Sequence, residues 1–168
     1  ARELAEGRAA LEAVLTPLLE ARAALLAQRD HLHRLVLAAV RNQPVCRRLM
    51  SVPGVGPVTA LTFCSAVDDP SRFTRSRAVG AHFGLTPRRY QSGETDRSGH
   101  ISKQGDALAA QALYEAANVL LTRTGRWSAL KAWGMAVAKR AGKRRAKVAV
   151  ARKLAVVLHR MWRDGTEF

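Results

Sequence analysis

Two closely spaced glycines, Gly54 and Gly56, are the residues whose type and spacing point most clearly to a chemical role in this sequence. Apolar residues flank them in the order that is typical of a helix-hairpin-helix motif over residues 49–60. Glycine adopts backbone angles that other residues resist, and its missing side chain lets a phosphate approach the main chain closely. The helix that follows presents unpaired N–H groups and the positive end of its dipole to such a phosphate. The pattern therefore predicts a sequence-independent contact with a nucleic-acid backbone, although a helix-turn-helix without a ligand uses similar glycines.

A run of basic residues near the C-terminus is the second candidate for phosphate contact. Eight Lys or Arg residues and no acidic residue occur between positions 139 and 153. A charge run is often only the solvated face of a helix, but the lack of any local counter-charge favours contact with phosphates. Such binding weakens steeply with salt because counterions are released from the nucleic acid. The residues that we single out in the basic helical tail, residues 139–163, are Lys143, Arg144, Arg145 and Lys147.

Three tryptophans, Trp127, Trp133 and Trp162, carry flat rings of the kind that stack on bases. Their helical spacing in an apolar setting favours a place in the core instead. We therefore expect all three to be buried.

The segments that position these residues are expected to be helices, and no strand pattern is convincing, so the predicted class is all-α. Pro44 ends the first helical stretch, because proline disfavours helical geometry in the residue before it. Asp106 is expected to cap a later helix. The helices of the compact part are expected over residues 45–50, 57–67, 77–83, 106–123, 127–135 and 144–163, and residues 84–105 form an exposed loop with room for a short hairpin.

Residues 1–42 have apolar residues at steps of three and four, which predicts a long amphipathic helix or a helical hairpin, kinked or interrupted near Pro17. A lone helix has little to bury against, so coiled-coil pairing with another copy, or with a missing part of the same protein, is its expected use. Packing on the chain's own C-terminal part is the alternative. We expect a coiled-coil connector at residues 1–44 and a compact helical domain at residues 45–168.

The net charge of +15 in 168 residues indicates a polyanionic partner and says nothing about the fold. Residues 1–44 carry +1, residues 45–105 carry +5 and residues 106–168 carry +9, so the positive charge lies away from the N-terminal helix. Cys46 and Cys64 lack partners at metal-ligand spacing, which favours two reduced thiols in a cytosolic protein. No apolar run is long enough to span a membrane and no signal peptide is visible. The chain opens inside a helical pattern without Met, which we interpret as a piece of a longer protein.

Two further motifs resemble a known family. Residues 83–93 read Phe-Gly-Leu-Thr-Pro-Arg-Arg-Tyr-Gln-Ser-Gly, and residues 97–105 read Arg-Ser-Gly-His-Ile-Ser-Lys-Gln-Gly. Together with Val-Pro-Gly-Val-Gly at residues 52–56, they closely resemble the C-terminal transposase domain of the insertion-sequence-110 family, which includes the Piv-type DNA invertases. The resemblance covers roughly residues 45–165, and the helical N-terminus is similar to the coiled-coil connector of that family.

The resemblance implies a DNA recombinase whose nucleophile is the serine at the position of Ser92. That serine would attack a phosphodiester and become covalently joined to the DNA, which conserves bond energy for religation. The family also carries an N-terminal RuvC-like domain with four acidic, metal-binding residues. The resemblance therefore implies magnesium in a domain missing here and no cofactor in this fragment, which would bind DNA or guide RNA but not cut. It further implies a structured guide RNA and a homodimer, formed through residues 1–42, that pairs into a tetramer when active.

Basic residues surround Ser92 in the sequence, and they suit the stabilisation of charge on a phosphate under attack. A serine hydroxyl needs a base or a metal to activate it, and no obvious base is present. This deficit fits a composite site whose metal comes from another part of the protein. The basic residues are Arg88, Arg89, Arg97 and Lys103; Glu94 and Asp96 are nearby acids, His100 is a candidate base, and Ser98 and Ser102 are competing serines.

The family typically has a Leu-Arg pair on the next helix, whereas Leu108 is followed here by Ala109. A basic contact is therefore missing, which leaves open a degenerate copy or a shifted contact. Two alternatives to a transposase remain: a non-catalytic helix-hairpin-helix module that docks a partner on DNA, and a scaffold in which residues 1–42 drive self-association.

Overall fold

The computed structural model describes residues 9–92 and 95–168, and it divides into two compact units, residues 1–39 and residues 40–168. The first unit consists of helix α2 (Ala9–Arg41). This helix continues through Pro17, so the predicted interruption and the helical hairpin are wrong and the single long helix is confirmed. Leucines at seven-residue spacing, Leu11, Leu18, Leu25 and Leu32, are all exposed along it.

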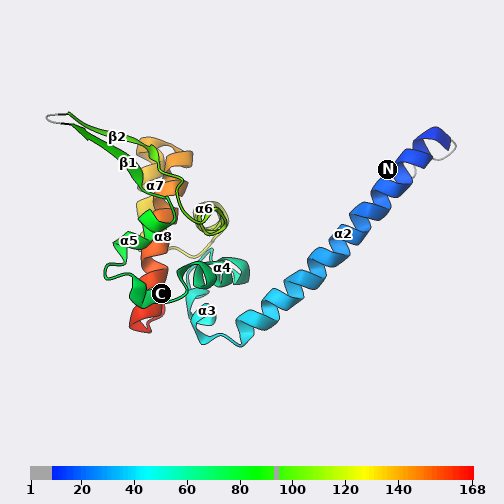
Figure 1. Cartoon of the computed structure of the whole chain (residues 1–168), viewed down its shortest axis with the longest axis horizontal. Coiled ribbons are helices and arrows are strands. Elements are labelled where there is room, and N and C mark those ends of the chain that lie inside the picture. The colour runs from blue at the N-terminus through cyan, green and yellow to red at the C-terminus, as the bar shows by residue number, and fades with distance from the viewer. Residues whose placement is uncertain (1–8, 93–94) are drawn as a thin grey trace. The chain divides into compact units, whose positions relative to one another are not determined.

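The second unit consists of helices with one small antiparallel sheet (Figure 1). The predicted all-α class, a long N-terminal helix followed by a compact helical part, is confirmed. The elements in chain order are α3 (Pro44–Leu49), α4 (Pro57–Val67), the 3₁₀ turn η1 (Pro70–Arg72), α5 (Arg77–His82), β1 (Pro87–Ser92), β2 (Thr95–Ile101), α6 (Ala107–Thr122), α7 (Ala129–Ala141) and α8 (Lys143–Asp164).

Local sequence signals explain where these helices begin. Proline stands in the first turn of α3 and of α4, where its missing N–H costs no helical hydrogen bond. The Asp106 carboxylate accepts a hydrogen bond from the Ala109 N–H, as the sequence predicts, and Ser128 caps α7 in the same way through the Lys131 N–H. Gly142 separates α7 from α8.

Helix α8 is the centre of the core and packs against α3, α5, α6 and α7. Its buried face includes Val150, Leu154, Leu158 and Met161. His159 is fully buried on the same helix, where Nε2 lies 2.9 Å from the Pro70 carbonyl oxygen and Nδ1 lies 3.0 Å from the Ser76 hydroxyl. Since a carbonyl only accepts, Nε2 carries the proton, and the ring ties α8 to η1 and to the start of α5.

Strands β1 and β2 form a hairpin that extends away from the helices (Figure 1). Ser92 pairs with Thr95, Tyr90 with Arg97 and Pro87 with Ile101, with a shift in register next to Pro87. All six residues of β1 are exposed, so neither face of this strand is covered by the helices. The hairpin replaces most of the loop that the sequence predicts at residues 84–105.

Several expected positions differ. Trp127 and Trp133 are 66% and 38% exposed, so the prediction that they lie in the core is wrong. Only Trp162 packs inside, with its ring centroid 6.5 Å from that of Phe63. Among the described residues, no helix combines the length and the apolar character that a membrane crossing requires.

Candidate nucleic-acid interface

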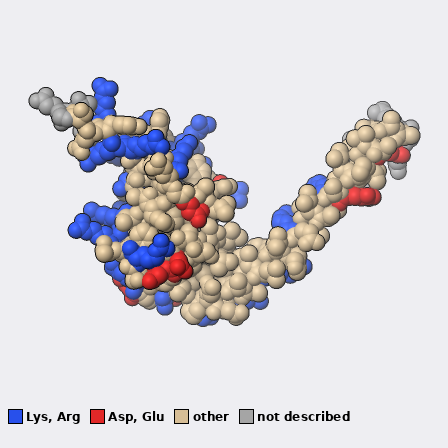
Figure 2. All heavy atoms as spheres, viewed as in Figure 1, with Lys and Arg blue, Asp and Glu red and all other residues tan. Residues whose placement is uncertain are grey.

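A basic groove of about 1410 Å³ opens between the base of the hairpin and helices α5, α7 and α8. Among the residues that the structure describes, eight Lys or Arg side chains line it and no Asp or Glu does. Figure 2 shows Lys and Arg gathered on the hairpin and on the helices beside it. The eight cations of the basic groove are Arg77, Arg88, Lys103, Arg144, Arg145, Arg152, Lys153 and Arg160.

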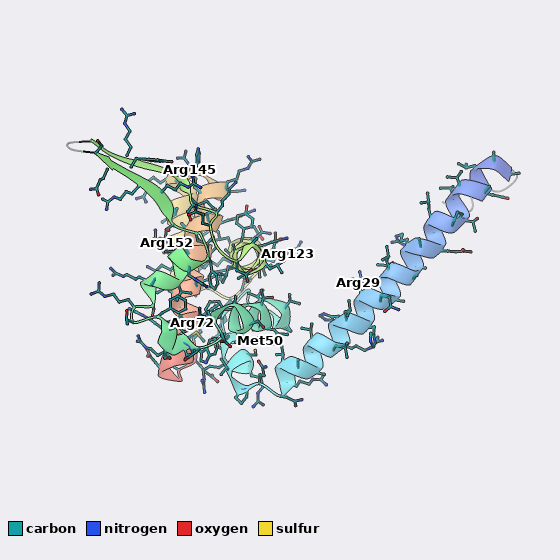
Figure 3. The ribbon with its side chains drawn as sticks, in the orientation of Figure 1. Arg29, Met50, Arg72, Arg123, Arg145 and Arg152 are labelled. Atoms are coloured by element: carbon teal, nitrogen blue, oxygen red, sulfur yellow. The ribbon has the colours of Figure 1, made fainter. Side chains whose placement is uncertain are left out.

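Helix α8 supplies five of the eight cations of the groove because it carries two neighbouring stripes of residues. One stripe is buried in the core, and the other recurs at steps of three and four, which places its members on one face of the helix. Arg145 and Arg152, labelled in Figure 3, belong to the second stripe together with Arg160. Ala149 and Val156 stand between these cations, so basic and small apolar side chains alternate along the groove.

The charges of the groove are not neutralised within the described part of the chain. No ion pair joins any of its cations to an acidic side chain among the described residues. Arg88 donates from Nη2 to the Ser102 carbonyl oxygen at 3.2 Å, and Lys153 holds its ammonium 4.9 Å from the centre of the Trp133 ring. Eight clustered cations repel one another, and an anionic ligand would relieve that repulsion.

Ser92 lies at the opposite end of the hairpin from the groove and is exposed. Because side chains alternate along a strand and paired residues share a face, Ser92 shares its face with Tyr90 and Arg97. Arg97 is the diagonal neighbour of Ser92, at a spacing of about 7–8 Å that long side chains bridge. Arg88 stands four residues from Ser92, which is about 14 Å along the strand.

The basic residues expected around Ser92 therefore separate into two places. Arg97 lies beside the serine in register, whereas Arg88 and Lys103 line the groove at the base of the hairpin. His100 also lines the groove, five residues beyond Thr95 and so about 17 Å along the strand from Ser92, too far to accept its proton directly. Glu94 and the side chains of Asp96 and Ser98 lie outside what the structure describes.

The predicted tail residues also divide between surfaces. Arg144 and Arg145 line the groove, while Lys143 and Lys147 do not. The Lys147 ammonium lies 5.8 Å from the centre of the Tyr114 ring, on the side of α8 that faces α6. Ser102 is a groove residue at the base of the hairpin, and Arg89 is exposed on β1 without lining the groove.

The predicted helix-hairpin-helix motif of residues 49–60, whose glycine turn we call the phosphate clasp, lies outside the groove, and its two glycines have different surroundings. A Cβ on Gly54 would lie 2.7 Å from the Ala116 carbonyl oxygen and 3.0 Å from the Leu120 nitrogen, and its φ is +92°. The close approach that Gly54 permits is therefore to α6 of the same chain. Gly56 has open space where its Cβ would be and stands directly before α4 without a side-chain cap, so a ligand has room to approach the main chain there.

Ala109, where the family pattern has Arg, is 1% exposed. A guanidinium at this position would enter the core, so position 109 of this chain offers no replacement for the missing contact. The sequence offered Trp133 as a ring that could stack on bases but favoured a place in the core, and it did not single out Arg77 or Arg160 as ligand contacts. The helical spacing of Arg145, Arg152 and Arg160 was a signal for Arg160, whereas Arg77 joins the groove only through packing.

The family model described as the transposase IS116/IS110/IS902 family matches residues 46–132, more than half of the chain. The chain belongs to this transposase family. The predicted resemblance is thereby confirmed. The matched region includes the hairpin and α6, whereas α8, the main wall of the basic groove, lies beyond it.

Two curated transposases illustrate the similarity. The transposase for insertion sequence element IS1111A of Coxiella burnetii is 36% identical over 130 residues, which cover 77% of this chain and 35% of the relative. The transposase for insertion sequence element IS1328 of Yersinia enterocolitica is 30% identical over 99 residues, covering 59% of this chain and 30% of the relative. The chain thus spans about a third of the length of these relatives.

Proposed function

We propose that this chain is the nucleic-acid-binding part of a DNA transposase and that Ser92 is the nucleophile that cleaves and rejoins DNA strands. The observation that carries the proposal is the position of Ser92, an exposed hydroxyl at the end of a projecting hairpin whose base forms a wall of the basic groove. Family membership supports the activity, and the cations of the groove support DNA as the ligand.

In the proposed reaction, Oγ of Ser92 attacks the phosphorus of a phosphodiester while its proton passes to a base. The bond between phosphorus and the leaving sugar oxygen breaks, and that oxygen takes up a proton. The new serine ester conserves the energy of the original bond, so the hydroxyl of another strand can reverse the step. Arg97, diagonal to Ser92 in the hairpin, would stabilise the negative charge that develops on the phosphate.

We place the base and the metal ion outside this chain. Within the described residues, no group of three His, Cys, Asp or Glu side chains could hold a metal ion. The residues that the structure describes therefore offer no ligand set that fits magnesium, whereas an acidic RuvC-like domain elsewhere in the protein would. When bound there, magnesium would neutralise phosphate charge and activate a nucleophile.

The proposal includes two partners besides DNA. The exposed leucines of α2 repeat every seven residues, which is the spacing of a coiled-coil seam, so α2 would pair with a second copy in a homodimer that assembles into a tetramer when active. A structured guide RNA would choose the DNA sites.

Light scattering tests the homodimer. The wild-type chain should be a dimer, and the double variant Leu18→Asp/Leu25→Asp should be a monomer.

The decisive experiment uses the intact protein. Ser92→Ala should abolish strand exchange and the covalent protein–DNA adduct while leaving DNA affinity unchanged. Ser65→Ala is the matched control, because Ser65 is an exposed serine of α4 outside the groove and the hairpin. Adduct mapping by mass spectrometry should place the phosphoester on Ser92. Unchanged strand exchange in Ser92→Ala would leave a non-catalytic DNA-binding module as the function.

A further inference from the structure

The basic groove has an apolar floor, which a surface that holds only phosphates does not need. Leu85 and Ile101 line it beside the hairpin, and Val148 and Val156 line it from α8. Leu85 is buried, whereas Ile101, Val148 and Val156 are partly accessible. Apolar side chains therefore stand among the cations, and they form a surface that water solvates poorly and that an apolar ligand group would cover.

Trp133 adds a flat aromatic surface to the same groove. It is 38% exposed, and Lys153 lies over its ring, so the ring is accessible yet already held next to a cation. Trp127 provides an internal comparison, since it is 66% exposed and Lys131 lies 5.7 Å from the centre of its ring. Only Trp133 lines the groove.

We infer that the basic groove holds unpaired bases of the DNA strand that is joined to Ser92, with one base stacked on Trp133 and the phosphates on the surrounding cations. An unpaired base offers an apolar ring face, whereas a duplex hides its bases and would present mainly phosphates to this floor. The volume of about 1410 Å³ exceeds the roughly 300–1,000 Å³ of small-molecule sites, which suits a segment of a polymer.

The assignment to DNA rests on the proposed role of Ser92. The hairpin has Ser92 at one end and Arg88 in the wall of the groove, about 14 Å away along the strand. That distance corresponds to about four nucleotides at the spacing of a stacked strand. A strand joined to Ser92 must leave its complement before it can join another partner, so its unpaired bases would become available within reach of the groove.

The test measures the affinity of the 168-residue chain for three fluorescent ligands by anisotropy: a short single-stranded DNA, the same sequence as duplex, and the same sequence as single-stranded RNA. Trp133→Ala should weaken binding of single-stranded DNA by about 5- to 100-fold, the equivalent of one lost base–aromatic stack. Trp133→Phe should restore most of the affinity, and duplex affinity should change by less than about threefold.

Two matched variants separate stacking from charge and from unfolding. Trp127→Ala should leave binding of all three ligands unchanged, because Trp127 lies outside the groove. Lys153→Gln should weaken single-stranded and duplex DNA alike and reduce the salt dependence, whereas Trp133→Ala should leave the salt dependence unchanged. Melting curves should match the wild type, and Trp133→Leu, which keeps an apolar side chain but has no ring, provides the test of lost stacking if Trp133→Ala does not fold.

Equal loss of duplex and single-stranded binding in Trp133→Ala would overturn the inference, and so would equal effects of Trp127→Ala and Trp133→Ala. Tighter, Trp133-dependent binding of RNA than of DNA would assign the groove to RNA and overturn the DNA assignment. These outcomes are independent of Ser92→Ala, which should retain single-stranded binding. Failure of the nucleophile would appear only as continued strand exchange by Ser92→Ala in the intact protein.

Discussion

Gly54→Ala isolates the structural role of the first glycine in the predicted clasp. At this position φ is +92°, and a Cβ would lie 2.7 Å from the Ala116 carbonyl oxygen and 3.2 Å from Leu120 Cβ. Gly56→Ala is the matched control, because Gly56 has φ −101° and nothing within 4 Å of its Cβ position. The two variants add the same methyl group two residues apart.

The expected cost at Gly54 has two parts. The left-handed backbone costs a residue other than glycine about 1–2 kcal/mol. The contact with the main chain of α6 forces the turn and the helix apart, at about 1–3 kcal/mol. Gly54→Ala should therefore destabilise the compact unit by about 2–5 kcal/mol, which lowers its melting temperature by about 10 °C or more. Gly56→Ala should cost at most about 1 kcal/mol, because alanine is a poor residue before a helix.

Thermal and urea denaturation followed by circular dichroism measure the difference, with DNA affinity measured on the folded fraction. The reasoning is refuted if Gly54→Ala melts at the same temperature as Gly56→Ala. The affinities test the clasp separately. If a phosphate approaches the main chain at Gly56, Gly56→Ala should lose DNA affinity while it remains folded.

Three further predictions concern polar groups of the core and of the helix ends. His159→Leu should lower the free energy of unfolding by about 2–4 kcal/mol in urea denaturation, because the Ser76 hydroxyl and the Pro70 carbonyl oxygen lose their hydrogen bonds to the ring. Ser76→Ala should cost less, and equal effects of the two variants would contradict this. Asp106→Ala should cost about 1 kcal/mol through the lost cap of α6, and no change in the urea midpoint would count against it. Burial raises the pKa of the Cys64 and Cys46 thiols in the folded chain. As pH rises above about 8.5, the unfolded chain loses these thiol protons while the folded chain keeps them, so the melting temperature should fall. The double Cys→Ala variant should flatten that fall.

Helix positions were predictable where the signal was local. Residues 57–67 and 106–123 were expected as helices and are observed as Pro57–Val67 and Ala107–Thr122, because proline and a capping carboxylate define their starts. For residues 84–105 the sequence predicted a loop with room for a short hairpin but did not define the strands, because residues 87–92 are polar, lack β-branched residues and have no alternation of apolar and polar types. A strand that is exposed on both faces has no buried side to produce that alternation.

The sequence alone determined the excess of positive charge, the long N-terminal helix and the membership of a transposase family. These properties depend on composition, on helical periodicity and on motifs whose residues are close together in the chain. The basic groove was decided only by the tertiary structure, since it joins residues 77–104 to residues 133–160. Likewise, only the packing of Gly54 against α6 shows that the core requires its missing side chain, whereas the Cβ position of Gly56 is open. Periodicity defines the faces of a helix, but only its distant neighbours determine which face is buried and which remains for a ligand.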